Sequence, residues 1–118
     1  MLEKSRSEIE LGRGGLDELR AAIENFLHEL VKKQSENPYP LHMPEKNIEK
    51  LEAMGYLYGE IKGLIVAILY NQVYKKLAEK VHKRQEVSLF EARLYLALVE
   101  EIIDYLFERV CRYKIKVR

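Results

Sequence analysis

Cysteine is nearly absent from this sequence, since Cys111 is the only one among 118 residues. A single thiol excludes an intramolecular disulfide framework and is typical of a reducing compartment. The sequence also has no large excess of positive or negative charge. The formal net charge is +1, so no overall field would recruit nucleic acid or an anionic membrane, and such a partner would need a local patch. These absences predict a cytoplasmic protein.

Long hydrophobic runs are missing as well. The longest apolar run in the middle of the chain covers residues 64–70, far below the ~20 residues of a membrane-spanning helix. The first residues are charged and have no apolar core of the signal-peptide kind. Proline occurs only at Pro38, Pro40 and Pro44. Because proline disfavours helix at the preceding residue, this segment predicts an extended connection between helices.

The residues that are present favour one folded domain. Apolar residues make up 47% and charged residues 33%, a balance that excludes the intrinsically disordered class. The many charges, with few Asn, Gln and Cys, are a thermophile-like bias. Glycines at positions 12, 14 and 15 predict a flexible N-terminal arm over residues 1–15. Residues 16–118 then form a single helical bundle domain.

Apolar residues recur at helical spacing in three segments. The first predicted helix covers 16–34, with an apolar stripe on one side and Glu24 among the charged residues on the other. A second helical pattern runs from Pro44, a favourable first residue, to Arg84. Ser88 and Glu91 form a capping box that begins the last helix. The predicted fold class is all-α, an antiparallel bundle of three long or four shorter helices.

The second pattern leaves two alternatives open. A continuous helix over 44–84 would be ~60 Å long, against ~28 Å for the first helix. It either breaks near Gly55 to Gly63 into two pieces or stays whole, with a second subunit covering the overhang. We favour the continuous or merely kinked form, because the apolar residues keep helical spacing through the glycines.

Small residues recur every fourth position in this segment, at Gly55, Gly59, Gly63 and Ala67. In a helix these residues lie one above another and form a bare ridge on which a second backbone could pack. Each interior glycine destabilises a helix by about 1 kcal/mol relative to alanine. We therefore expect close packing against the glycines to offset this loss. The ridge predicts a helix-packing surface, either within the chain or at a dimer interface.

The last helix is apolar around most of its circumference, which predicts a central position in the bundle or burial at an interface. Apolar residues recur at intervals of three and four along one seam of this helix. Further apolar side chains, such as Leu94, Leu98 and Tyr105, widen that seam. This width, added to the glycine ridge, is more than three helices of one chain would cover. We therefore expect a homodimer or a higher helical assembly.

Two other kinds of site are weaker. Glu79 and His82 have the Glu-x-x-His spacing of carboxylate-bridged metal bundles, but a di-metal site needs a second such pair. They remain remote candidates, and we expect neither a bound metal nor a cofactor. Basic residues gather at the ends of two predicted helices, where the helix dipole favours cations, and phosphate contact is conceivable there. These residues are Lys75, Lys76, Lys80, Lys83 and Arg84, and Arg109, Arg112, Lys114, Lys116 and Arg118.

The sequence contains no specific catalytic or nucleic-acid-binding motif. It therefore favours a non-enzymatic protein that acts through helix–helix contacts, as a structural, adaptor or assembly subunit. The first alternative is a nucleic-acid-associated accessory subunit that uses the basic helix ends. The remote alternative is a metal-binding carboxylate and histidine bundle. The expected partners are a second copy of the chain or another protein, and no membrane.

Overall fold

A computed structural model of the chain describes residues 15–34, 36–83 and 87–112. All regular structure in these ranges is helical, as predicted, and four helices pack together. The predicted flexible arm falls almost entirely outside the described residues. The helices are α2 (Leu16–Lys33), α3 (Pro44–Ala53), a long helix made of α4 (Gly59–Ile65), η1 (Val66–Tyr74) and α5 (Lys75–Lys83), and α6 (Leu89–Phe107), which η2 (Glu108–Arg112) extends.

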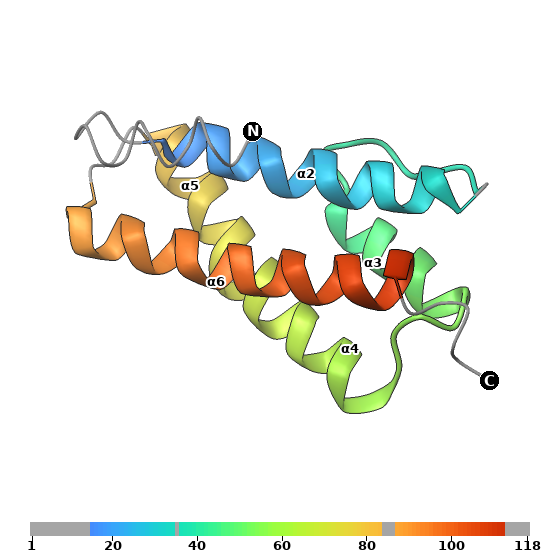
Figure 1. Cartoon of the computed structure of the whole chain (residues 1–118). Coiled ribbons are helices and arrows are strands. Elements are labelled where there is room, and N and C mark those ends of the chain that lie inside the picture. Colours follow the sequence, from blue (N-terminus) through green and yellow to red (C-terminus); the bar gives the residue numbers. More distant parts are fainter. Residues whose placement is uncertain (1–14, 35, 84–86, 113–118) are drawn as a thin grey trace.

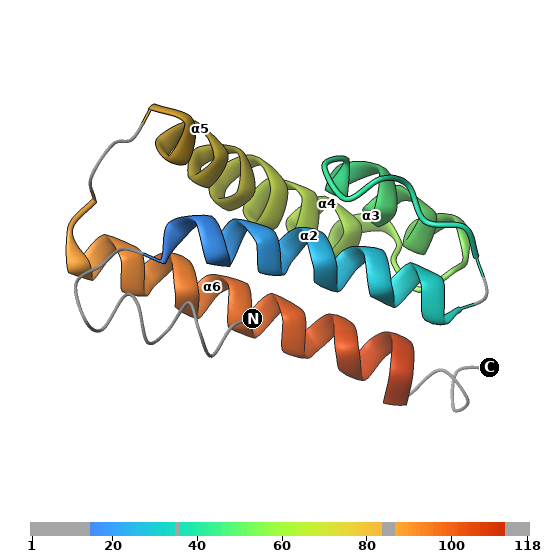
Figure 2. The same cartoon turned by 90° about the horizontal axis from the view of Figure 1, so that it is seen from above.

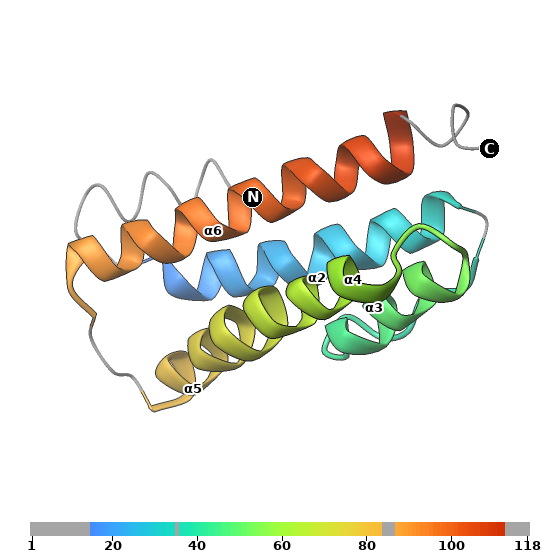
Figure 3. The same cartoon turned by 90° about the horizontal axis from the view of Figure 1, so that it is seen from below.

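Helix α2 lies in the middle of the bundle. It contacts α3, α5 and α6, and Figures 2 and 3 show it between α6 and the long helix. Its predicted apolar stripe is buried, and Leu19, Leu27 and Val31 are fully enclosed. The prediction that the last helix is central is therefore wrong. Most of the predicted seam of α6 is buried, but only one side of the helix faces the core.

The long helix runs opposite to α2 and α6, which both start at the same end of the molecule (Figure 1). The segment after α2 runs back along it, so that α3 lies parallel to α2. Asn47, which is fully buried, fixes this return. Its Oδ1 accepts a hydrogen bond of 2.8 Å from the backbone N–H of Tyr39, and its Nδ2 donates one of 3.2 Å to the Tyr39 carbonyl.

The predicted continuous helix over 44–84 is wrong, because α3 ends in a Schellman motif. The N–H of Tyr56 donates to the carbonyl of Leu51, and the N–H of Gly55 donates to that of Glu52. Gly55 has a φ of 90°, in the left-handed region that glycine adopts at no steric cost. The Tyr56 hydroxyl then donates 2.9 Å to Gln34 and holds the turn against the end of α2. Gly55 therefore ends a helix and does not belong to a ridge.

The middle of the long helix is a π-helix, η1. Its core residues recur at a strict interval of four: Ile61, Ile65, Leu69, Val73 and Leu77. In an α-helix of 3.6 residues per turn, such a stripe rotates by ~40° at each step. The wider turns of a π-helix reduce this rotation. The stripe thereby stays on the core side of the long helix.

Two glycines of the predicted ridge should respond to alanine with opposite signs. Gly63 is helical and exposed, and an added Cβ would meet nothing within 4 Å, so Gly63→Ala should stabilise the fold by about 0.5–1 kcal/mol. Gly55→Ala should destabilise it by about 1–2 kcal/mol, because of the positive φ. Urea unfolding of both variants in dilute protein measures the difference. Equal effects would contradict the assigned helix end.

Candidate functional site

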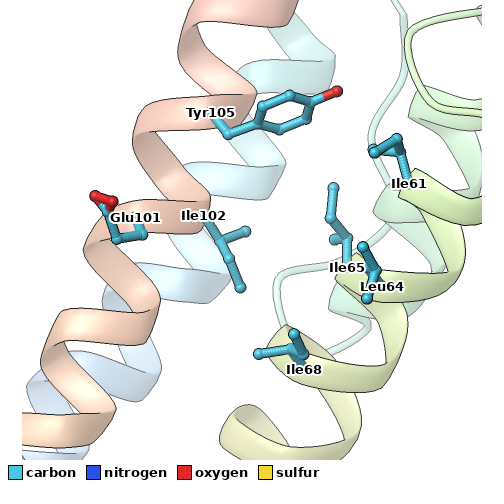
Figure 4. A pocket seen from close by; sticks show the side chains of 7 residues that line it. All are labelled: Ile61, Leu64, Ile65, Ile68, Glu101, Ile102 and Tyr105. Carbon is cyan, nitrogen blue, oxygen red and sulfur yellow. The ribbon is translucent and has the colours of Figure 1, made fainter.

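An apolar groove lies between α4–η1 and α6. Its volume is about 250 Å³. Figure 4 shows Ile102 and Tyr105 pointing from α6 toward the long helix, which contributes four aliphatic side chains. The only charged residue at the groove is Glu101, on the outer side of α6. The full lining is Ile61, Leu64, Ile65, Ile68, Glu101, Ile102 and Tyr105.

Exposed apolar side chains continue from the groove along α6. Phe90 is 80% exposed, Leu94 is 59% exposed and Tyr105 is 39% exposed, while Leu64 across the groove is 55% exposed. Residues 90, 94, 97, 101 and 105 follow intervals of three and four, so they form one exposed stripe on α6, which reaches the groove at Tyr105. We call residues 90, 93, 94, 97, 98, 101 and 105 together with the groove the α6 surface.

The bundle leaves this surface open because α6 is apolar on more sides than its neighbours cover. Its buried line, which contains Leu96, Val99 and Leu106, packs against α2 and η1. Leu98 and Ile102 are half-buried at the edge of that line. Contiguous exposed apolar patches on a folded domain commonly mark interaction sites. The apolar residues of α6 are therefore divided between the core and an exposed face.

The α6 surface carries two opposite charges in different halves. Arg93 lies in the first half of the helix and Glu101 in the second, and both are exposed. Neither forms an ion pair or hydrogen bond with the residues that the structure describes. The surface thus combines an apolar band with a basic position at one end and an acidic position toward the other.

A second cluster is polar and lies in the core between α2 and η1. Glu24 is buried, against the prediction that it belongs to the exposed side of its helix. The Tyr74 hydroxyl donates a hydrogen bond of 2.5 Å to Glu24 Oε2, and Arg20 donates one of 2.9 Å to the same oxygen. Arg20 also binds Asp17 at 2.6 Å. The buried carboxylate is therefore neutralised by a cation on the next turn of α2.

The pKa values in this cluster follow from burial and charge. Burial raises the pKa of the Tyr74 hydroxyl far above its ordinary value, and the hydrogen bond to Glu24 and its negative charge raise it further, against an opposing effect of Arg20. For Arg20, partial burial lowers the pKa, but the hydrogen bond to Asp17 and the charges of Glu24 and Asp17 raise it overall. Tyr74 is therefore a neutral donor and Arg20 a permanent cation.

Tyr70 supports this cluster from the solvent side. Its ring stacks on that of Tyr74, with centroids 5.7 Å apart, and the Lys75 ammonium lies 5.6 Å from its centroid. Burial raises the pKa of Tyr70, and the charge of Glu45 and a hydrogen bond to it act in the same direction. The cluster thus ties α2, η1 and the start of α3 together, and every group in it is matched by a partner.

Within the described ranges, the predicted metal candidates are not brought together with further ligands. Glu79 and His82 are both exposed on α5, and Glu79 pairs with Lys83 at 3.4 Å. Glu24, which has helical spacing to His28, already accepts hydrogen bonds from Tyr74 and Arg20. Among the residues that the structure describes, no group of three His, Cys, Asp or Glu side chains could hold a metal ion.

The described residues of the two basic clusters belong to α5 and η2, which lie at opposite ends of the bundle (Figure 1). Lys75, Lys76 and Lys83 are exposed on α5, and Lys80 is half-exposed there. Arg109 is half-exposed at the other end, in η2. Arg84, Lys114, Lys116 and Arg118, and the side chain of Arg112, lie outside the described part of the structure. Phosphate contact by either cluster stays a prediction.

The small-residue stripe remains on the long helix as Gly59, Gly63 and Ala67, which are exposed. A Cβ built on Gly55, Gly59 or Gly63 would meet nothing within 4 Å, so no other described element packs there. The interpretation as a helix crossing within the chain is wrong for these residues. Their use at a dimer interface stays a prediction.

Comparison of the chain with protein-family models, with curated proteins and with solved structures finds no match. A search of the described residues for membrane spans finds no helix of sufficient length and apolarity.

Proposed function

We propose that this protein is a non-enzymatic assembly subunit that associates with a second copy of itself through the α6 surface. The observation that carries the proposal is the apolar band of Phe90, Leu94 and Tyr105, which continues into the groove below Leu64. Fully burying a Leu or Phe side chain contributes about 1.5–3 kcal/mol. Several such side chains in one band supply a driving force for association that no single exposed residue provides.

The polar cluster around Glu24 supports a structural role and not a catalytic one. Glu24 Oε2 already accepts from both Tyr74 and Arg20, so it would have to lose a partner before it could take a proton from a substrate. The groove itself is lined by aliphatic side chains and Tyr105, with Glu101 at its outer side. Such a lining favours an apolar protein surface over a polar substrate.

Light scattering across a dilution series tests the proposal. We expect a concentration-dependent dimer between about 1 and 200 µM, which salt weakens only modestly because apolar contacts supply most of the driving force. Leu64→Glu should convert this dimer to monomer, and in protein dilute enough to be monomeric it should change the melting temperature little, because Leu64 is exposed in the single chain. Leu41→Glu, in the exposed connection between α2 and α3, is the matched control and should leave the mass unchanged.

Two outcomes would overturn the proposal. A monomer at every concentration would mean that the α6 surface does not drive self-association. A protein peak with high absorbance at 260 nm that loses nucleic acid as salt is raised would instead favour the accessory subunit with basic helix ends, because phosphate contacts weaken steeply with salt.

A further inference from the structure

We infer that the two copies meet through their α6 helices in antiparallel orientation, with the two-fold axis between Ala97 and Leu98. This inference rests on the proposed function and adds the geometry of the interface. A symmetric dimer needs a surface that is complementary to itself. The α6 surface meets this requirement when the second helix runs in the opposite direction and the axis lies near the middle of the exposed stripe.

The order of the exposed residues sets the position of the axis. Phe90 and Tyr105 are equally distant in sequence from the midpoint between Ala97 and Leu98, and so are Leu94 and Glu101. In an antiparallel pair, residues equally distant from the axis lie opposite each other. Phe90 of one copy therefore meets Tyr105 of the other, and the most exposed aromatic ring reaches the end of the groove.

Charge selects the antiparallel orientation over the parallel one. Glu101 of one copy lies level with Leu94 and beside Arg93 of the other, so each copy offers the other's acidic residue a cation. A parallel pair in the same register would place Glu101 against Glu101 and Arg93 against Arg93. Like charges across an interface oppose association, whereas complementary charges fix the register. The absence of partners for both residues among the described ones agrees with this arrangement.

The exposed residue beside the axis is small. Ala97 is exposed in the middle of the stripe, and its short side chain lets the two helices approach closely at the crossing. On either side of it, Leu94 and Leu98 supply aliphatic surface. The second copy thus completes the groove, since Phe90 and Leu94 of that copy would lie over Tyr105, Ile102 and Leu64.

A charge swap tests the register. Arg93→Glu and Glu101→Arg should each raise the dimer dissociation constant about 10-fold, because each places like charges together. The double variant restores opposite charges and should return the constant to within about threefold of the parent, as expected for a directly coupled pair. Lys76→Glu and Glu29→Arg, exposed on α5 and α2, are the charge-matched controls and should leave the constant unchanged.

Cysteine cross-linking tests the orientation in the same protein. With Cys111→Ala as background, Ala97→Cys should form a covalent dimer on mild oxidation, because both thiols lie beside the axis. Tyr105→Cys should not, since an antiparallel register separates the two positions 105 by ~22 Å along the helices. Lys76→Cys is the exposed control for random collision.

The outcomes separate the two proposals. If Leu64→Glu abolishes the dimer but the double reversal does not restore it, or if position 105 cross-links in place of 97, the antiparallel α6 pairing is wrong and self-association through the α6 surface stands. If the parent protein is monomeric throughout, the proposed function itself fails. Rescue by the double reversal together with cross-linking at 97 is the expected result.

Discussion

Replacing Leu27 with alanine is expected to lower the free energy of unfolding by about 3–4 kcal/mol. Leu27 is fully buried in α2, the helix that contacts three others. Its truncation removes apolar contacts and leaves a cavity in a region that cannot easily collapse, which in comparable cases costs about 2.7–5.0 kcal/mol. For a domain with a total stability of about 5–15 kcal/mol, this is a large fraction.

Leu94→Ala in α6 is the matched control, and it should cost less than about 1 kcal/mol in protein dilute enough to be monomeric, because Leu94 is largely exposed there. Denaturant unfolding of the two variants, monitored by circular dichroism, provides the comparison. Equal losses at both positions, or a larger loss at Leu94, would contradict the central position of α2.

This contrast also indicates what the sequence could and could not predict about the core. The apolar stripes of α2 and α6, the bounds of α2 and the start of α6 were predictable, because these helices have a start signal or a breaker: the Ser88 hydroxyl accepts a hydrogen bond of 3.1 Å from the N–H of Glu91, as the capping box predicts. The central helix was not. The apolar residues of α6 form two surfaces, one in the core and one exposed. The sequence alone does not show which of these residues belong to which surface.

The break in the second helical pattern was missed because glycine at these positions is compatible with two different structures. At an interval of four, Gly55, Gly59 and Gly63 are compatible with a packing ridge, and Gly55 alone is also the usual residue of a left-handed helix end. Only the hydrogen bonds to Leu51 and Glu52 decide between them. The π-helix, in contrast, left a readable signal: five apolar residues from Ile61 to Leu77 at a strict interval of four, which a regular α-helix would not keep on one face.

The sequence predicted an excess of apolar residues on the last helix, and the structure shows part of that excess exposed on α6. The residues named for a helix contact were instead the small residues of the neighbouring helix, and the expected homodimer stays a prediction. The polar cluster was not predicted at all. Glu24 follows the charged side of its helix in sequence, and only Tyr74, fifty residues later, makes its burial possible. Pairings of this kind depend on tertiary structure and leave no local pattern.

Removing the Tyr74 hydroxyl should be the second largest of the expected effects on stability. Tyr74→Phe keeps the ring and its stacking on Tyr70 but deprives the buried Glu24 carboxylate of a donor at 2.5 Å. A hydrogen bond to a charged group contributes about 1.5–3 kcal/mol, so we expect a loss of this order at neutral pH. Tyr58→Phe, at a ring that is mostly exposed, is the matched control and should have almost no effect.

The pH dependence of this loss identifies its cause. Burial and Glu24 raise the pKa of Tyr74 above its unfolded value of about 10, so at higher pH the unfolded chain releases this proton while the folded chain retains it. The contribution of the tyrosine to stability is therefore complete below pH ~10 and declines as the pH rises above that value. The difference in unfolding free energy between the parent and Tyr74→Phe should shrink in this range. The pKa values of Tyr70 and Tyr95 are also raised, so these residues lower the stability of the parent and of Tyr74→Phe by the same amount as the pH rises. A difference that stayed constant from pH ~8 to pH ~11 would mean that Tyr74 does not hold its proton against Glu24.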